Sequence, residues 1–204
     1  MNRTYSDSSN YQDKRVIRSK KAIREAFFAE LQKKDYGKIT ITDIANEAGI
    51  NRKTFYTYYD GVEDLLEEIE TELIDKFRPL FSTLNLKSTT FSARDFFDKF
   101  NQLVRDDFEV YHLLNQCGQL AHLLGKVQAL VVDIIMSQVE VEINDHHELA
   151  RLTLMSQYVA AGILSMVSCW IAEPGDISLD EFTDLAGSLT LYGLNRTVII
   201  PSKE

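Results

Sequence analysis

Three consecutive polar residues, Arg52, Lys53 and Thr54, carry side chains that suit a nucleic acid. They follow Asn51, one of the residues that best cap a helix, so we expect them in the opening turn of a helix at 52–58. In helix-turn-helix proteins the N-terminal residues of the second helix face the base edges. Arginine and lysine suit guanine edges, while hydroxyl groups and helix N-termini suit phosphates. The residue types and their position therefore predict a DNA-contacting surface.

The preceding residues predict an upstream helix at 41–48 and a tight turn after it. Thr40 can cap this helix, and Asp43 stands three residues later, close to the capping-box pattern. Gly49 predicts the end of the helix, because a left-handed residue there costs glycine least. We expect the small residues Ala45 and Gly49 to let the two helices cross closely. An ordinary helical hairpin is the alternative, but it leaves the basic, aromatic downstream helix unexplained.

The net charge of −9 divides unevenly along the chain. Residues 1–60 hold 12 Lys and Arg against 8 Asp and Glu, a balance of +4, whereas residues 61–204 carry −13. A polyanion would be attracted by the first part and repelled by the second. The charge pattern therefore fits an acidic protein that meets DNA with its N-terminal part.

Apolar residues at helical spacing run through the rest of the chain. A stripe of Ile23, Ala26, Phe27 and Leu31 predicts a helix at 14–34. The chain has three prolines and no sustained alternation of period two, so we predict an all-α fold. The other predicted helices are 62–77, 93–108, 110–116, 120–144, 147–172 and 178–195, the last capped by Ser178.

These patterns predict two domains behind a polar tail. Residues 1–12 are rich in Ser, Asn and Tyr and are expected to be disordered. Residues 13–73 are expected to form a three-helix DNA-binding domain, with the helix-turn-helix motif at about 40–59. Residues 74–204 are expected to form a larger helical domain for regulation and dimerisation, with Pro79 marking a bend or stop in the helix that joins the two.

The chain shows no pattern of an enzyme. It has no nucleophile–base set, no Gly-rich phosphate loop and no paired catalytic carboxylates. His112 and His122 could meet across helices, but a metal site needs more ligands. Cys117 and Cys169 are far apart in apolar contexts, which favours two free thiols in a reducing cytosol. We therefore predict a protein without catalytic residues, cofactor or metal.

The sequence also favours a cytoplasmic location. Its polar N-terminus lacks the apolar core of a signal peptide. The most apolar run, 159–171, is too short to cross a bilayer and contains serine, glycine and cysteine.

The predicted helix at 147–172 is apolar nearly all round, so it should be buried on two sides. It could be a central core helix, or it could pack its own domain on one side and a twin copy on the other. In the second interpretation the last helix would complete a four-helix interface. The predicted interface residues are Met155, Val159, Gly162, Ile163, Met166, Leu185, Leu189 and Tyr192.

Aromatic and polar side chains among apolar neighbours suggest a ligand pocket in the larger domain. Each of them is also compatible with an ordinary core position. The candidate pocket residues are Phe97, Phe100, Tyr111, His112, His122, Tyr158 and Trp170.

The N-terminal third resembles the TetR/AcrR family of transcriptional regulators. The resemblance covers about residues 15–75, and the rest matches only as an acidic, all-helical domain. It is carried by Ile39-Thr40-Ile41-Thr42-Asp43-Ile44-Ala45, Ala48-Gly49-Ile50-Asn51, Thr54-Phe55-Tyr56-x-Tyr58-Tyr59 and Glu63-Asp64-Leu65-Leu66, together with the stripe of the first predicted helix.

The resemblance implies a cytoplasmic homodimer that binds a pseudo-palindromic operator, usually as a repressor. It also implies a helical domain that holds a small-molecule inducer. By their places in the motif, Arg52, Lys53 and Thr54 would contact bases or nearby phosphates. Tyr56 and Tyr58 would contact the backbone, and Thr40 and Thr42 would contact phosphate.

The chain departs from the family pattern just after the motif. Many members carry His-Phe where this chain has Tyr58-Tyr59, and a lysine where it has Val62, preceded here by Asp60. Losing that lysine removes a phosphate contact and predicts weaker DNA binding, unless another cation compensates. An alternative function is therefore a coactivator that works mainly through protein contacts. A helical enzyme is a third class, but the chain offers no catalytic set for it.

Overall fold

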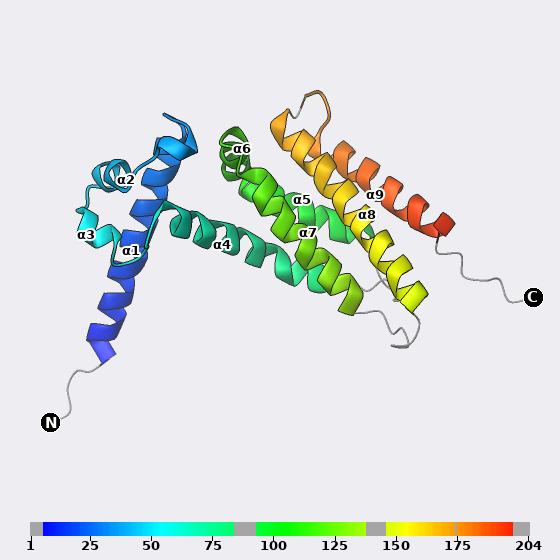
Figure 1. Ribbon diagram of the computed structural model, residues 1–204, viewed down its shortest axis with the longest axis horizontal. Coiled ribbons are helices and arrows are strands. Elements are labelled where there is room, and N and C mark those ends of the chain that lie inside the picture. Colours follow the sequence, from blue (N-terminus) through cyan, green and yellow to red (C-terminus); the bar gives the residue numbers. More distant parts are fainter. Residues whose placement is uncertain (1–5, 84–92, 138–145, 174, 198–204) are drawn as a thin grey trace, which may run out of the picture. The chain divides into compact units, whose positions relative to one another are not determined.

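The computed structural model describes residues 6–83, 93–137, 146–173 and 175–197, and the side chains of 14–83, 94–137, 146–173 and 175–189. Over these residues the chain is helical, which confirms the predicted all-α fold (Figure 1). The chain forms two compact units, an N-terminal unit, Met1–Thr71, and a C-terminal unit, Glu72–Glu204. The boundary between them lies within one helix. The elements are α1 (Ser6–Leu31), the 3₁₀ turn η1 (Tyr36–Lys38), α2 (Ile41–Glu47), α3 (Arg52–Phe55), α4 (Val62–Ser82), α5 (Ala93–Asp106), α6 (Phe108–Gln116), α7 (Leu120–Ser137), α8 (His146–Ala172) and α9 (Leu179–Thr197).

The N-terminal unit has a small apolar core to which every one of its helices contributes. Ile23 and Phe27, one helical turn apart on α1, are fully buried. Ile44 of α2 and Phe55 of α3 are equally buried, and Leu65 closes the core from α4. Because α2 and α3 are too short to be stable alone, this burial holds them in place.

The first helix begins earlier than predicted. We expected a disordered tail over residues 1–12, but α1 starts at Ser6, so the prediction is wrong from that residue on. The reason is that the packed stripe of α1 nucleates a helix, and residues 6–31 contain no proline or glycine to stop it. Residues 1–5 lie outside the described residues.

The turn between α2 and α3 has the geometry that the sequence predicts. Gly49 has φ +65°. Its N–H donates to the Asn46 carbonyl at 3.2 Å, and the Ile50 N–H donates to the Ala45 carbonyl at 2.9 Å. These two bonds form a Schellman motif, which ends α2 and turns the chain toward α3.

Gly49 is needed for its backbone conformation rather than for close helix packing. A Cβ atom added there would meet nothing within 4 Å, so the expected close crossing at this residue is wrong. Ala45, by contrast, is buried. The left-handed φ alone therefore explains the glycine.

In the C-terminal unit α7 and α8 run side by side, and α6 packs on both (Figure 1). Helix α5 packs against α9, where the Thr183 hydroxyl donates to Oδ1 of Asn101 at 2.6 Å in a buried contact. Pro79 does not stop α4, which runs three residues further to Ser82. The missing proline N–H removes only one bond near the end of the helix.

Helix α8 is buried on one side only in the described protomer. Ser156, Ala160, Leu164 and Val167 face its own unit, while Tyr158 on another side is 80% exposed. The alternative of a fully enclosed core helix is therefore wrong. Helices α7 and α8 are each long and apolar enough to cross a membrane, but the core helix of a soluble protein meets the same test.

The left-handed turn gives a first prediction. Gly49→Ala is expected to lower the free energy of unfolding of the N-terminal unit by about 1–2 kcal/mol, because a Cβ atom is strained at positive φ. Urea unfolding followed by the amide NMR signals of α2 measures the change. The control is Gly37→Ala in η1, where a Cβ atom meets nothing within 4 Å and φ is not left-handed. Equal losses in the two variants would contradict the role of φ at Gly49.

Candidate nucleic-acid interface and internal cavity

Arg52 and Lys53 lie exposed in the first turn of α3. Among the described residues neither forms an ion pair or hydrogen bond through its side chain, whereas Lys20, Lys34 and other lysines of the same unit do. Two neighbouring cations are thus left free for an external anion. This is the electrostatic arrangement expected at a DNA-reading helix.

Helix α3 is capped as predicted but is shorter. The Asn51 Oδ1 atom accepts hydrogen bonds from the Thr54 N–H at 2.8 Å and from the Thr54 hydroxyl at 3.1 Å. The helix was expected to run to 58, but it ends at Phe55 and passes into tight turns. Tyr56 is exposed and Tyr58 is half-buried, so at least the first is open to a partner.

Thr40 caps α2 through a complete capping box. The Asp43 N–H donates to the Thr40 hydroxyl oxygen at 3.2 Å, and the Asp43 carboxylate accepts from the Thr40 N–H at 2.9 Å and from its hydroxyl at 2.7 Å. Lys34 lies 3.0 Å from the same carboxylate. The Thr40 hydroxyl, its N–H and Lys34 together lower the pKa of Asp43 from 3.8 to about 2. Thr42 is exposed beside them.

An ion-pair cluster ties the end of α1 to α2. Lys33 lies 3.0 Å from Glu30 and 2.6 Å from Glu47, and Lys34 bridges Glu30 at 2.8 Å to Asp43. Glu30 is buried, so these lysines neutralise a charge that would otherwise be costly. The cluster positions α2, and through it the start of α3.

A second cluster joins α1, the turn that follows α3, and α4. The Tyr59 hydroxyl donates to Glu68 at 2.6 Å, and Lys20 pairs with the other oxygen of Glu68. Lys20 also lies 5.3 Å from the centre of the Tyr59 ring. Burial raises the pKa of Glu68, but the bonds from Lys20 and Tyr59 outweigh it and lower the pKa overall. Sequence spacing gave no signal for this contact, because its members are far apart in the chain.

The start of α4 carries no cation. Val62 is buried in the N-terminal unit, so its side chain is not available to a phosphate. Asp60, Glu63 and Asp64 are exposed around it, and the Asp60 N–H donates to Asp64 at 3.0 Å. Exposed cations of this unit occur instead on α1, at Lys14, Arg15 and Arg18.

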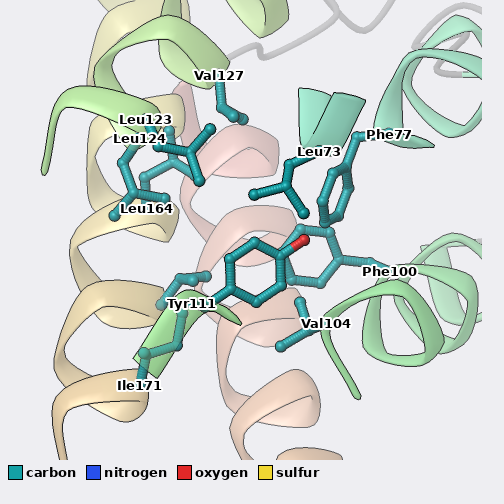
Figure 2. A pocket seen from close by; sticks show the side chains of 11 residues that line it. Leu73, Phe77, Phe100, Val104, Tyr111, Leu123, Leu124, Val127, Leu164 and Ile171 are labelled. Atoms are coloured by element: carbon teal, nitrogen blue, oxygen red, sulfur yellow. The ribbon is translucent and has the colours of Figure 1, made fainter. Parts of the chain in front are cut away.

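The C-terminal unit contains a cavity of about 30 Å³ (Figure 2). Of the predicted pocket residues, Phe100 and Tyr111 line it. The other lining residues are aliphatic or phenylalanine side chains from several helices: Leu73, Phe77, Val104, Leu123, Leu124, Val127, Leu164, Val167 and Ile171. Sequence reasoning missed them because nothing in an apolar helical pattern shows which positions converge in space.

Two predicted pocket residues pack between helices instead. Phe97 of α5 lies where α9 approaches closely, since a Cβ atom added to Gly187 would come within 3.2 Å of its ring. Trp170 donates from Nε1 to the Ile177 carbonyl at 2.9 Å, and its ring packs against Phe182. Neither ring lines the described cavity, and both contribute to the packing of the unit.

The other predicted pocket residues, His112, His122 and Tyr158, are not part of the cavity lining. His112 donates from Nδ1 to the Ile171 carbonyl at 3.2 Å and accepts at Nε2 from Gln116 at 3.0 Å, which joins α6 to α8. His122 is exposed on α7, and Tyr158 is exposed on α8. Three His, Cys, Asp or Glu residues placed to hold a metal do not occur among the described residues.

The predicted dimer residues divide between an inner and an outer face. Met155, Val159, Ile163 and Met166 are half-buried against their own unit, whereas Gly162, Leu185 and Leu189 are exposed, and the side chain of Tyr192 lies outside the described residues. Leu154, 71% exposed, and Tyr158 share the outer face of α8 with Gly162. A helix that is apolar all round does not indicate from sequence which stripe faces inward, so the sequence alone did not show this division.

The geometry of the N-terminal unit defines a helix-turn-helix domain, and comparison with known proteins identifies its family. Residues 23–69 match the family model of bacterial regulatory proteins, tetR family. YxbF of Bacillus subtilis (strain 168), described as an uncharacterized HTH-type transcriptional regulator, is 28% identical over 181 residues. That alignment covers 83% of this chain but 45% of YxbF, so the chain spans less than half the length of this relative.

Solved structures show the same fold over most of the chain. A TetR transcriptional regulator from Streptococcus agalactiae 2603V has a TM-score of 0.60 at 17% identity, covering 89% of this chain and 98% of that one. The dihydroxyacetone kinase operon activator DhaS has a TM-score of 0.57 at 20% identity, covering 87% and 97%. Residues 23–69 therefore form a helix-turn-helix domain of the tetR type, and the chain as a whole has the fold of these regulators.

The low pKa of Asp43 predicts how acid affects the N-terminal unit. Because the folded-state pKa is depressed, the carboxylate stabilises the unit fully above about pH 4 and loses this effect as the pH falls toward about 2. Asp43→Asn is expected to flatten the dependence of the unfolding free energy on pH in this window. Urea unfolding at a series of pH values, followed by α2 amide signals, measures it.

The control for this prediction is Glu63→Gln, which removes an exposed carboxylate of the same unit. If Glu63→Gln flattened the dependence as much as Asp43→Asn, general charge rather than the contacts of Asp43 would set it.

Proposed function

We propose that the protein is a cytoplasmic homodimeric repressor that binds a pseudo-palindromic operator and responds to a small-molecule effector. The observation that carries the DNA-binding part is the exposed pair Arg52 and Lys53 at the start of α3, whose side chains have no ion-pair partner in the part of the chain that the structure describes. Thr54, Tyr56 and Thr42 add exposed or half-exposed hydroxyl groups that suit phosphate. Thr40 and Tyr58 complete the proposed DNA-contacting set.

The exposed apolar residues of the C-terminal unit support a homodimer. Leu154 and Tyr158 on α8, and Leu185 and Leu189 on α9, leave large apolar side chains in water. The two helices pack on each other, and a two-fold axis would pair each with its copy. A symmetric dimer suits two operator half-sites roughly 34–36 Å apart.

The apolar cavity supports an effector site, and two of the predicted residues, Phe100 and Tyr111, remain in it. Two similarly folded proteins are named as regulators, and the name of one of them gives the sign of regulation. DhaS is named an operon activator, and FadR of Bacillus halodurans, with a TM-score of 0.56 at 15% identity, is named a fatty acid degradation regulator. We propose repression because the resemblance of the N-terminal motif implies it.

The proposed DNA contacts of α3 are tested with a duplex that the protein selects from a random DNA pool. Arg52→Ala and Lys53→Ala are each expected to weaken binding at least about tenfold, since a good contact to a base edge contributes about 1–3 kcal/mol. If the lost contact is to phosphate, the slope of log affinity against log salt should fall by about two, one for each subunit. Electrophoretic shifts at several salt concentrations measure both.

Lys38→Ala is the matched control, because Lys38 is an exposed lysine of the same unit that already pairs with Asp35 at 2.6 Å. It should change affinity little. Unchanged binding by both the Arg52 and Lys53 variants would show that α3 is not the reading helix.

The dimer surface is tested by charge. Leu154→Lys combined with Tyr158→Lys should bring like charges together across a two-fold axis and dissociate the dimer. Light scattering at micromolar concentration should then report one chain, 23.4 kDa, instead of two. Ile177→Lys, at another exposed apolar residue of this unit, is the control. A monomeric unmodified protein would remove the dimer from the proposal.

A coactivator that works through protein contacts is the second candidate function. The buried Val62 and the exposed Asp60, Glu63 and Asp64 favour it, because they place negative charge where a phosphate contact is expected. The same salt titration separates the two functions. Failure to select or shift any duplex, even at low salt, would favour the coactivator, whereas salt-dependent binding would favour the repressor.

A further inference from the structure

The Tyr111 hydroxyl is the buried side-chain polar atom for which the described residues provide no hydrogen-bond partner. Tyr111 lies on α6 and is 4% exposed. Its hydroxyl points toward Leu73 and Phe100 in the cavity lining (Figure 2). Buried polar groups in proteins are nearly always hydrogen-bonded, because an unpaired one loses its interaction with water without replacement. The wall of the cavity therefore holds a buried donor that lacks an acceptor.

The rest of the lining decides what kind of molecule could supply that acceptor. The ten other lining side chains are hydrocarbon, and none carries a charge. An ionised ligand would leave water without finding an opposite charge, which is very unfavourable in an apolar site. Burial, with a smaller contribution from Asp107 and then Asp106, raises the pKa of Tyr111, so the phenol remains a proton donor at neutral pH.

A water molecule does not fit these requirements well. The cavity, about 30 Å³, is large enough for one, but a stably bound water needs two to four polar partners. Among the lining side chains the polar group is the Tyr111 hydroxyl alone, and it lies buried in the wall. A ligand whose apolar part contacts the lining and whose acceptor meets the hydroxyl would satisfy both kinds of surface, although a ligand larger than a few atoms must push wall side chains apart.

We propose that this cavity selects neutral, mainly apolar molecules with one hydrogen-bond acceptor, such as a carbonyl oxygen bound by Tyr111, and excludes ionised ones. The inference rests on the proposed effector response and specifies the chemical class of the effector. Tyr111 is then the residue that distinguishes such a molecule from a plain hydrocarbon.

Four ring compounds test the selectivity: acetophenone is neutral with an acceptor, benzene lacks the acceptor, and benzoate and benzylammonium are ionised. Each is titrated into the 204-residue protein with ¹³C-labelled Leu and Val methyl groups, because the cavity is lined by these residues and their signals locate binding there. The titrations are repeated with Tyr111→Phe, which keeps the ring. They are repeated again with Leu124→Ala, which makes room at a half-buried wall position.

In the unmodified protein or in Leu124→Ala, acetophenone should bind at least about tenfold more tightly than either ion. Adding Tyr111→Phe should weaken acetophenone by about two- to tenfold and leave benzene unchanged, as expected for loss of one neutral hydrogen bond. Three results would overturn the inference: an ion that binds as tightly as acetophenone, acetophenone binding that ignores Tyr111→Phe, or cavity methyl signals that respond to no probe in either background.

The titration contains no DNA, so it separates this inference from the proposed function. A protein that binds its selected duplex but ignores all four probes would lose the ligand class alone. A protein that discriminates among the probes but binds no duplex would keep the cavity selectivity and lose the proposed repressor function.

Discussion

The proposed DNA-contacting surface depends on keeping two very short helices folded. Helix α2 has seven residues and α3 has four, and isolated helices of this length do not form in water. Their backbone ends are satisfied locally, by Thr40 at α2 and by Asn51 at α3. The left-handed Gly49 turns one into the other, and the fully buried Phe55 holds α3 against the core. The positions of Arg52 and Lys53 follow from these contacts.

The distribution of charge within the N-terminal unit also supports the proposed DNA-contacting surface. Its lysines near α1 and α2 largely form ion pairs with carboxylates, as Lys33 and Lys34 do with Glu30, Glu47 and Asp43. Such pairs are partly exposed and add modest stability, but they fix helix orientation. The cations at the start of α3 have no such partner among the described residues. The net charge of +4 over residues 1–60 therefore does not show where the unpaired positive charges lie within the unit.

Local chemistry made the N-terminal unit predictable from sequence. The caps Thr40 and Asn51 and the turn at Gly49 are contacts between near neighbours in the chain, so residue type and spacing suffice. The Tyr59–Glu68–Lys20 contact was not predictable, because it joins three separate segments. In the C-terminal unit apolar spacing correctly predicted the helices, but it did not show that Phe97 packs at Gly187 while Phe100, one turn away, lines the cavity.

In both units the groups that indicate an external partner have no hydrogen-bond or ion-pair partner among the described residues. The energetic cost of lacking that partner differs between the two. Exposed cations such as Arg52 are solvated by water, so leaving them free costs the folded protein little. The Tyr111 hydroxyl is buried among hydrocarbon side chains, so leaving it free is destabilising in the absence of a ligand. Removing the hydroxyl would relieve that penalty, whereas an acceptor would turn it into a stabilising bond. A donor retained at such a position therefore makes the stability of the C-terminal unit sensitive to what occupies the cavity, which is the property that an effector-responsive unit requires.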